Sequence, residues 1–271
     1  DRSQTPDLHY PMPTSFSREE CVCNPVRLFT IISMQRCGSG WFETLLNSHV
    51  NVSSHGEVFS VRERRSDASS ILLVLDRLYN LDWFTSASKN QCSAAVGLKW
   101  MLNQGLMDHP VEISNHLKSK GVSVIFLFRR NLLRRMVSLL ANSYDRNAKL
   151  LNGTHKSHVH SRKEAHILSS YKPTINSTSL VSDLRVTERM ALRAVENFGS
   201  NRHIIVWYED LMKNRTKLLL EVQEFLGVPT MELTSRQVKI HDGALSKYIA
   251  NWDEVRRILQ GTEYERFLST D

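Results

Sequence analysis

The chain contains little cysteine and no long apolar run. Four cysteines in 271 residues are too few for a disulfide framework. There is no initial methionine and no signal peptide, so we expect the chain to be a fragment or a processed form. It also lacks a recognition helix, an aromatic RNA-binding signature and zinc-finger spacing, so we expect no nucleic-acid partner.

A lysine is missing from the most informative stretch, Leu28 to Leu46, which reads LFTIISMQRCGSGWFETLL. An apolar run, a polar loop with two glycines and a helical pattern follow one another. This arrangement points backbone N–H groups and the positive end of a helix dipole at an anion. Gly38 and Gly40 allow positive φ and close backbone approach.

A Walker loop would place Lys and Ser or Thr after its last glycine, where this chain has Trp41 and Phe42. The loop is therefore predicted to hold a phosphate but not Mg-ATP. The alternative is an ordinary turn between a strand and a helix.

A second basic motif follows the apolar strand Val124–Phe128. Arg130 lies at the carboxyl end of this strand, and Ser138 follows two helical turns later. Parallel α/β sheets bind ligands at the carboxyl ends of their strands, so this pair could bind a second phosphate. The alternative is a solvated basic helix start, and we expect Arg134 and Arg135 to face solvent or an acidic partner. The buried side of the helix is predicted to be apolar: Leu132, Leu133, Met136, Val137, Leu139 and Leu140.

Two phosphate sites without a magnesium motif resemble the sulfotransferase family. In that family the first loop holds the 5′-phosphosulfate of PAPS (3′-phosphoadenosine 5′-phosphosulfate), and an Arg…Ser pair with the spacing of Arg130 and Ser138 holds the 3′-phosphate. The late stretch HIIVWYEDLMKNRTKLLLEVQEFLGVP also resembles the family's strand, turn and helix. The resemblance covers about Arg27 to Val228, apart from a central insert.

Within the family the chain most resembles the bacterial Nod-factor sulfotransferase and its plant relatives. The stretch Ser54-His55-Gly56-Glu57-Val58-Phe59 is similar to the segment in which a Gly-Glu pair supplies the catalytic carboxylate. The loop Gln-Arg-Cys-Gly-Ser-Gly departs from the usual Pro-Arg-Ser-Gly-Thr form, so Ser39 and Gly40 replace Gly-Thr or lie one residue shifted. The resemblance implies a carbohydrate acceptor, with a peptide tyrosine or a small molecule still open.

Sulfuryl transfer requires a group that takes the proton of the acceptor hydroxyl. Glu57 is the first candidate and His55 the second. If both lie on one extended segment, they point the same way. The alternative for Glu57 is a structural role as a surface carboxylate or an arginine partner.

Charge that develops during transfer needs fixed donors, and Arg36 and the loop amides are candidates. Lys99 lies where the apolar strand Ala94–Leu98 ends. Tyrosyl-protein relatives resemble this chain in placing a lysine there, where it contacts the bridging oxygen, although such a lysine can also be merely solvated. No metal is implied, because Arg and Lys can neutralise the transferred group.

The resemblance implies that PAPS is the cosubstrate and PAP (3′,5′-adenosine bisphosphate) the product. It also implies a nucleotide-binding set that includes a late closing loop: Arg36, Cys37, Gly38, Ser39, Gly40, Trp41, Arg130, Ser138, Lys239, Ser246 and Lys247.

The domain organisation is predicted to be simple. Residues 1–26 read as a stem or flexible arm, and residues 27–271 as a single domain. An insert at about 148–182 is long enough to be functional or disordered, and its place suggests a lid on the acceptor side. The insert contains four histidines that suggest a metal site: His155, His158, His160 and His166. No cysteine or carboxylate cluster accompanies them, so we expect no metal to bind there.

Four N-x-[ST] sequons occur, at Asn51, Asn152, Asn176 and Asn214. Sequons, the stem-like start and family habit favour the Golgi lumen, with a type II membrane anchor upstream of this chain. The cytosol is the alternative. In an oxidising lumen, Cys92 could pair with Cys21 or Cys23.

We predict a three-layer α/β fold with a mostly parallel central sheet flanked by helices, similar to the P-loop nucleotide-binding fold. The expected strands are Arg27–Ser33, a short one near Ser53, Ala94–Leu98, Ser123–Phe128 and His203–Trp207. A net charge of +7 suits an anionic cofactor or substrate. Two alternatives to a sulfotransferase remain: a non-catalytic nucleotide- or polyanion-binding protein of this fold, and a nucleoside or small-molecule kinase.

Overall fold

The computed structural model describes residues 25–89 and 93–269. The stem at residues 1–26 falls almost wholly outside this range, as do Cys21, Cys23 and Cys92 with their predicted pairing. The chain divides into two compact units. The sheet unit comprises Asp1–Phe128 and Leu192–Ser235, and the helical unit comprises Arg129–Ala191 and Arg236–Asp271. A single domain over residues 27–271 stays a prediction.

The sheet unit is built on a five-stranded parallel sheet with strand order β2-β3-β1-β4-β5. The strands are β1 (Arg27–Ser33), β2 (Val52–Ser54), β3 (Ala95–Met101), β4 (Ser123–Phe128) and β5 (His203–Trp207). Each predicted strand is present, and β1, β4 and β5 have the predicted bounds. The prediction for β3 stopped too early, because this strand continues through Lys99 to Met101.

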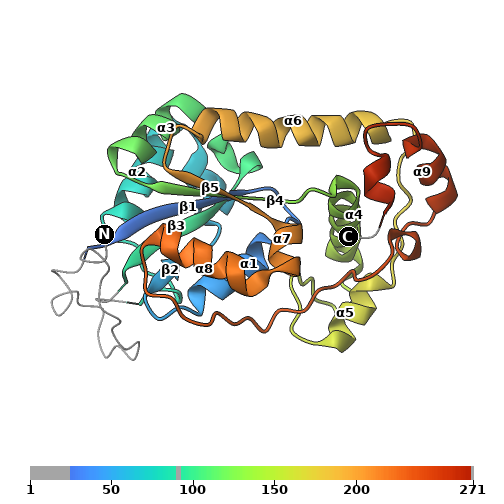
Figure 1. The fold of residues 1–271 in the computed structure, drawn as a ribbon, viewed down its shortest axis with the longest axis horizontal. Helices are drawn as coiled ribbons and strands as arrows, with labels where there is room; N and C mark the ends of the chain where they lie inside the picture. The colour runs from blue at the N-terminus through green and yellow to red at the C-terminus, as the bar shows by residue number, and fades with distance from the viewer. Residues whose placement is uncertain (1–24, 90–92, 270–271) are drawn as a thin grey trace. The chain divides into compact units, whose positions relative to one another are not determined.

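Helices cover both faces of the sheet, as the three-layer prediction requires (Figure 1). One face carries α1 (Ser39–Asn47) and α8 (Arg215–Leu226). The other carries α2 (Ala68–Tyr79) and α3 (Pro110–Ser119). Shorter elements complete the unit: η3 (Val58–Ser60), η4 (Arg62–Arg65), η6 (Leu102–Leu106) and α7 (Tyr208–Lys213).

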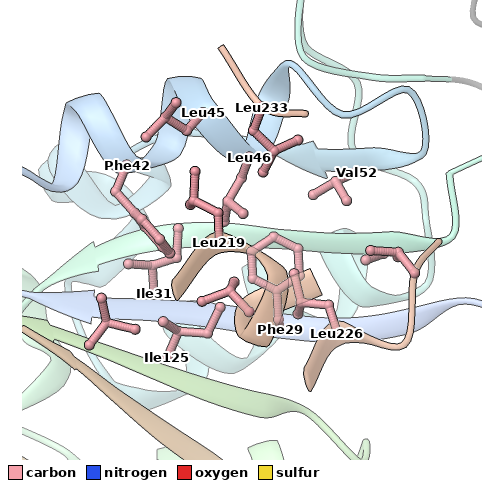
Figure 2. Packing of buried hydrophobic residues seen from close by; sticks show 14 of the residues in the cluster. Phe29, Ile31, Phe42, Leu45, Leu46, Val52, Ile125, Leu219, Leu226 and Leu233 are labelled. Atoms are coloured by element: carbon pink, nitrogen blue, oxygen red, sulfur yellow. The ribbon is translucent and has the colours of Figure 1, made fainter. Parts of the chain in front are cut away.

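The core beneath α1 and α8 explains why these two helices dock on the sheet. Phe29 and Ile31 lie two residues apart on β1, so their side chains project to the same face of the sheet. Phe42 and Leu45 of α1 pack against them there (Figure 2). Leu219 of α8 packs in the same cluster. Burial of each large apolar side chain contributes about 1.5–3 kcal/mol. This packing fixes the helix that follows the glycine loop.

The helical unit contains α4 (Leu132–Ala148), α5 (Arg162–Ser169), η7 (Leu245–Lys247), α9 (Trp252–Leu259) and η8 (Glu265–Leu268). Helix α6 (Leu180–Phe198) begins in this unit and ends in the sheet unit. Asn131 caps α4 by accepting a hydrogen bond from the backbone N–H of Arg134 at 3.0 Å. The same side chain donates to the carbonyl of Phe267 at 3.1 Å.

Two predictions for α4 are wrong. Leu139 is exposed, because it lies outside the side of α4 that packs against the apolar cluster of this unit. Arg134 is buried instead of facing solvent, and its guanidinium donates to the carbonyl of Gly243 at 2.8 Å. A charged side chain tolerates burial when such partners replace water.

The insert at 148–182 is folded, and its role as a lid on the acceptor side stays a prediction. It contains α5, and a small apolar cluster forms around Leu151, Val159, Ala165 and Leu168. His155 pairs with Asp145 at 2.7 Å. Among the described residues, no group of three or more His, Cys, Asp or Glu side chains is placed to hold a metal ion.

Within the ranges 25–89 and 93–269, no helix combines the length and the apolar content required to cross a bilayer.

Leu219→Ala is expected to lower the free energy of unfolding by about 2–5 kcal/mol, because it leaves a cavity beneath α8. Leu220→Ala, one residue further on the exposed side of α8, should cost less than about 1 kcal/mol. Urea denaturation followed by circular dichroism measures both. Equal losses for the two variants would contradict the docking of α8 described here.

Candidate functional site

The loop between β1 and α1 is closed by a glycine that no other residue can replace without strain. Gly38, the residue before α1, has φ +82°. A Cβ on Gly38 would lie 2.4 Å from Cδ2 of Tyr208, so the ring at the start of α7 packs directly on the loop. Trp41 adds an edge-to-face contact with the same ring, at 6.4 Å between centroids.

The second glycine of the loop has a different place from the one predicted. Gly40 lies within the first turn of α1, where positive φ is not needed, and the left-handed residues of the loop are Gly38 and Arg36 (φ +67°). Helix α1 has no acidic side chain in its first turn and no side-chain cap at its N-terminus. A helix start of this kind offers its backbone N–H groups to an anion.

The side chains around this loop differ in exposure. The thiol of Cys37 is buried, so only the backbone of this residue could contact a ligand. Ser39 is buried, whereas Arg36 and Trp41 are half-buried. Gln35 donates to Oδ1 of Asn103 at 2.7 Å, which ties the loop to the segment that follows β3.

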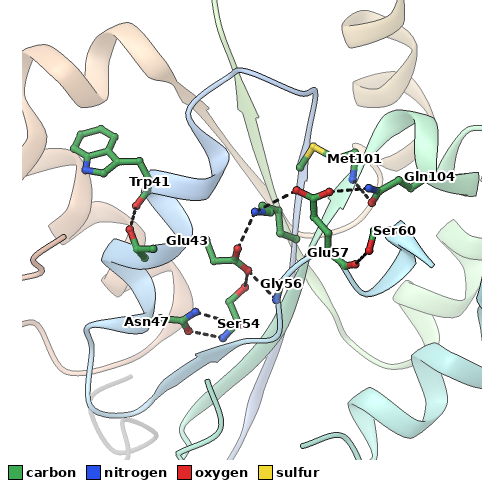
Figure 3. A network of polar contacts seen from close by, with 11 residues as sticks. Trp41, Glu43, Asn47, Ser54, Gly56, Glu57, Ser60, Met101 and Gln104 are labelled. Atoms are coloured by element: carbon green, nitrogen blue, oxygen red, sulfur yellow. Dashed lines mark hydrogen bonds and ion pairs between the residues drawn. The ribbon is translucent and has the colours of Figure 1, made fainter. Parts of the chain in front are cut away.

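Lys99 lies in the carboxyl-terminal half of β3, where it joins two carboxylates. Figure 3 shows the polar network around these carboxylates, Glu43 and Glu57. The ammonium of Lys99 lies 2.9 Å from Oε2 of Glu43 and 3.4 Å from Oε1 of Glu57. The side chain of Lys99 is 8% exposed, so it is not solvated. It is also not at the strand end, because β3 continues to Met101. Parallel pairing of β3 with β1 sets Lys99 beside Ile31, one strand from the start of the loop.

Glu43 holds this lysine from the buried side. It lies one turn into α1, and its side chain is 10% exposed. Its Oε1 accepts hydrogen bonds from Ser54 Oγ at 2.7 Å and from the backbone N–H of Gly56 at 2.9 Å. The carboxylate therefore satisfies Lys99 and fixes the turn that precedes Glu57.

Glu57 is held at both oxygens but remains open to solvent. Gln104 donates to Oε2 at 2.8 Å, while Oε1 faces Lys99. Gln104 is itself fixed, since its backbone carbonyl accepts a hydrogen bond from the indole N–H of Trp100 at 2.8 Å. With 38% of its side chain exposed, Glu57 has an oriented carboxylate with lone pairs available to a hydroxyl.

His55 belongs to a separate environment. Strand β2 ends at Ser54 and Gly56 has φ +75°, so the extended segment assumed for His55 and Glu57 does not exist. His55 Nδ1 lies 2.9 Å from the hydroxyl of Thr85, in a small cavity also lined by Trp83 and Phe84. Burial lowers the pKa of His55 to about 4, so its ring is neutral at neutral pH.

The remaining predicted residues lie in the helical unit. Arg130 is exposed immediately after β4, and Ser138 is buried on α4. Lys239 forms an ion pair with Asp242 at 3.0 Å, whereas Ser246 and Lys247 are exposed on η7. Of the predicted set, the structure brings Lys99 and Glu57 into one network in the sheet unit.

Sequence reasoning missed Glu43 and Gln104. The signal for Glu43 was its position between Phe42 and Leu45 on the apolar side of α1, where a carboxylate needs a buried partner. Gln104 gave no signal, because it follows β3 in a short irregular helix.

Comparison with known proteins places this geometry in a family. Nodulation protein H of Rhizobium meliloti is 25% identical over 250 residues, covering 90% of this chain and 95% of the relative. Nodulation protein H of Rhizobium tropici is 26% identical over 255 residues, covering 90% and 93%. The solved sulfotransferase domain from the Curacin biosynthetic pathway gives a TM-score of 0.44 at 17% identity, with 90% and 89% coverage, and adds nothing to the assignment.

The family model described as Sulfotransferase domain matches residues 28–253, which include both the glycine loop and the Lys99 network. This match confirms the family resemblance that the sequence motifs predict. The chain therefore belongs to the sulfotransferase family and is an enzyme of that class.

Proposed function

We propose that this enzyme transfers the sulfuryl group of PAPS to an acceptor hydroxyl on a carbohydrate and releases PAP. The observation that carries the proposal is the pairing of Glu57 with Lys99 beside a helix start that has no side-chain cap. The carbohydrate acceptor is supported by resemblance to the Nod-factor branch and by the match to nodulation proteins.

The loop after β1 suits the 5′-phosphosulfate. Backbone N–H groups at the start of α1 and the helix dipole both favour an anion there. Arg36 supplies a fixed positive charge on the same loop. These donors are part of a rigid turn, since Gly38 is packed against Tyr208. Donors that need not move at the moment of reaction are the most effective in stabilising charge.

Glu57 takes the role of general base. Its carboxylate accepts the proton of the acceptor hydroxyl as the hydroxyl oxygen forms a bond to sulfur. The bond between sulfur and the bridging phosphate oxygen breaks, and the electron pair leaves with the phosphate. The hydrogen bond from Gln104 aims the carboxylate without saturating it.

Lys99 takes the role of an electrostatic stabiliser. Because Glu43 and Glu57 flank the ammonium, the group is held at a fixed position next to the base. Its positive charge offsets the negative charge that grows on the leaving oxygen. Protonation of Glu57 during transfer weakens one of the two ion pairs of Lys99. The ammonium of Lys99 is then more available to the leaving oxygen.

Arg130 and Ser138 are proposed to bind the 3′-phosphate, with Lys239, Ser246 and Lys247 closing over the nucleotide. Arg130 is an exposed residue at the carboxyl end of β4, which suits this role. Location in the Golgi lumen also remains a prediction. The sequons at Asn152, Asn176 and Asn214 are exposed, whereas Asn51 is fully buried and unsuited to carry a glycan in the folded chain.

Two alternative functions differ in what they require of the same residues. A kinase needs a lysine and a magnesium-binding hydroxyl after the last loop glycine, and this chain has Trp41 and Phe42 there. A non-catalytic binder would not require the carboxylate of Glu57.

Glu57→Gln is expected to lower kcat for sulfuryl transfer by about 10²–10⁴-fold, because the amide cannot take the proton. Binding of PAP should change little. Transfer of radiolabelled sulfate from PAPS to chitin oligosaccharides and to heparin oligosaccharides measures the first, and calorimetry the second. Glu63→Gln, at an exposed carboxylate on η4, is the matched control. Unchanged kcat in Glu57→Gln would show that Glu57 is not the general base.

Arg130→Ala is expected to weaken PAP binding by about 2–4 kcal/mol, because a charge-assisted contact to the 3′-phosphate is lost. Binding of 5′-AMP, which has no 3′-phosphate, should change far less. Calorimetric titration of both nucleotides measures the difference, with Arg146→Ala near the far end of α4 as control. Equal losses for the two nucleotides would refute the assignment of Arg130.

A further inference from the structure

The positive charge of the chain is confined to one part of it. The sheet unit has 17 basic and 18 acidic residues, whereas the helical unit has 18 and 10. Between residues 129 and 191 there are 12 basic and four acidic side chains, so this stretch alone carries a net charge of +8. Arg130 is the only charged side chain of this stretch that the phosphate sites proposed above use. Most of its charge therefore has no assigned role.

Half of this net charge lies on a packed body, which we call the basic segment (residues 144–172). It contains six basic and two acidic side chains. Its apolar cluster around Leu151 and Val159 and a bridge from Val159 to Val238 give it a fixed fold. The rings of Tyr144 and Tyr171 stack at 3.7 Å and join its two ends.

Both acidic side chains of the basic segment are already engaged. Asp145 is buried and bonds His155 at 2.7 Å and the backbone N–H of Leu150 at 3.0 Å. Glu164 pairs with Lys156 at 2.6 Å. The other five basic side chains are exposed, and none makes an ion pair within the described part of the chain: Arg146, Lys149, Arg162, Lys163 and Lys172.

We propose that the basic segment binds an anionic polysaccharide, one that carries carboxylate or sulfate groups. Exposed cations on a preorganised body attract a polyanion and release its counter-ions. The proposal rests on the proposed function, because a carbohydrate acceptor is the reason to prefer a glycan to another polyanion. It specifies that acceptor as a negatively charged chain that the helical unit also binds.

A membrane surface is less well supported. Of the large apolar side chains of the basic segment, all of which the structure describes, Tyr144 alone is exposed, and its ring is stacked on Tyr171. Peripheral membrane segments combine basic residues with an apolar face that enters the lipid. Nucleic acid and lipid nevertheless serve as competing outcomes of the test.

The test compares two variants of the full chain that each lose four positive charges. The surface variant replaces Arg146, Lys149, Arg162 and Lys163 with Gln. The control variant replaces four exposed basic residues of the sheet unit with Gln, namely Lys118, Lys213, Arg215 and Lys217. Calorimetry at 0.15 M salt measures the Kd of each for heparin oligosaccharides, dextran, single-stranded DNA and phosphatidylserine vesicles.

We expect the surface variant to bind heparin oligosaccharides about tenfold or more weakly than the unmodified chain, and the control variant to change less than about twofold. Dextran, which is uncharged, should not bind. Equal losses in the two variants would overturn the proposal, because net charge alone would then explain binding. Tighter binding of DNA or vesicles than of heparin would overturn it in favour of that partner.

The same samples separate this proposal from the proposed function. PAP binding should be unchanged in the surface variant, since none of the four residues belongs to the nucleotide site. If Glu57→Gln retained full sulfuryl transfer while the surface variant still bound heparin more weakly, only the assignment of Glu57 as general base would fail. Loss of PAP binding in the surface variant would show general damage and overturn the assignment of a distinct glycan surface.

Discussion

The buried ion pair between Lys99 and Glu43 is the interaction on which the rest of the site depends. It joins three elements that are distant in sequence: α1, the turn after β2, and β3. Both side chains are almost fully buried, and each replaces part of the hydration that the other loses. Removal of one partner from such a pair typically costs about 3–5 kcal/mol, because an uncompensated charge stays behind. The position of Glu57 depends on this pair, because Glu43 also holds the N–H of Gly56.

The same pair links binding to chemistry. Glu43 lies on the helix whose N-terminus is proposed to hold the phosphosulfate, and Lys99 lies beside the proposed base. A single helix thus fixes both the anion site and the lysine that offsets charge on the leaving oxygen. Because α1 is held by the apolar cluster beneath it, the geometry does not rely on flexible surface contacts.

Much of this fold follows from the sequence, and the departures have physical causes. Strands buried on both faces read as short apolar runs, which is why the bounds of β1, β4 and β5 are predicted correctly. The predicted end of β3 is wrong because a lysine interrupts the apolar run, and Glu43 neutralises that lysine from another element. Arg134 is buried for a similar reason, since its partner Gly243 is more than 100 residues away.

The candidate site is predictable only in part. The glycine loop and Glu57 are visible as motifs, because backbone geometry and a resemblance point to them. Glu43 and Gln104 are not, since their roles exist only through contacts made by the folded chain. Local patterns show which residues can carry chemistry, whereas the residues that orient them are defined by tertiary packing.

Calorimetric binding of PAP, 5′-AMP and Mg-ATP to the unmodified chain would show whether the site is built for PAPS. We expect PAP to bind most tightly of the three, with an affinity that does not depend on magnesium. Equal affinity for PAP and 5′-AMP, or tighter binding of Mg-ATP, would contradict a site built for PAPS.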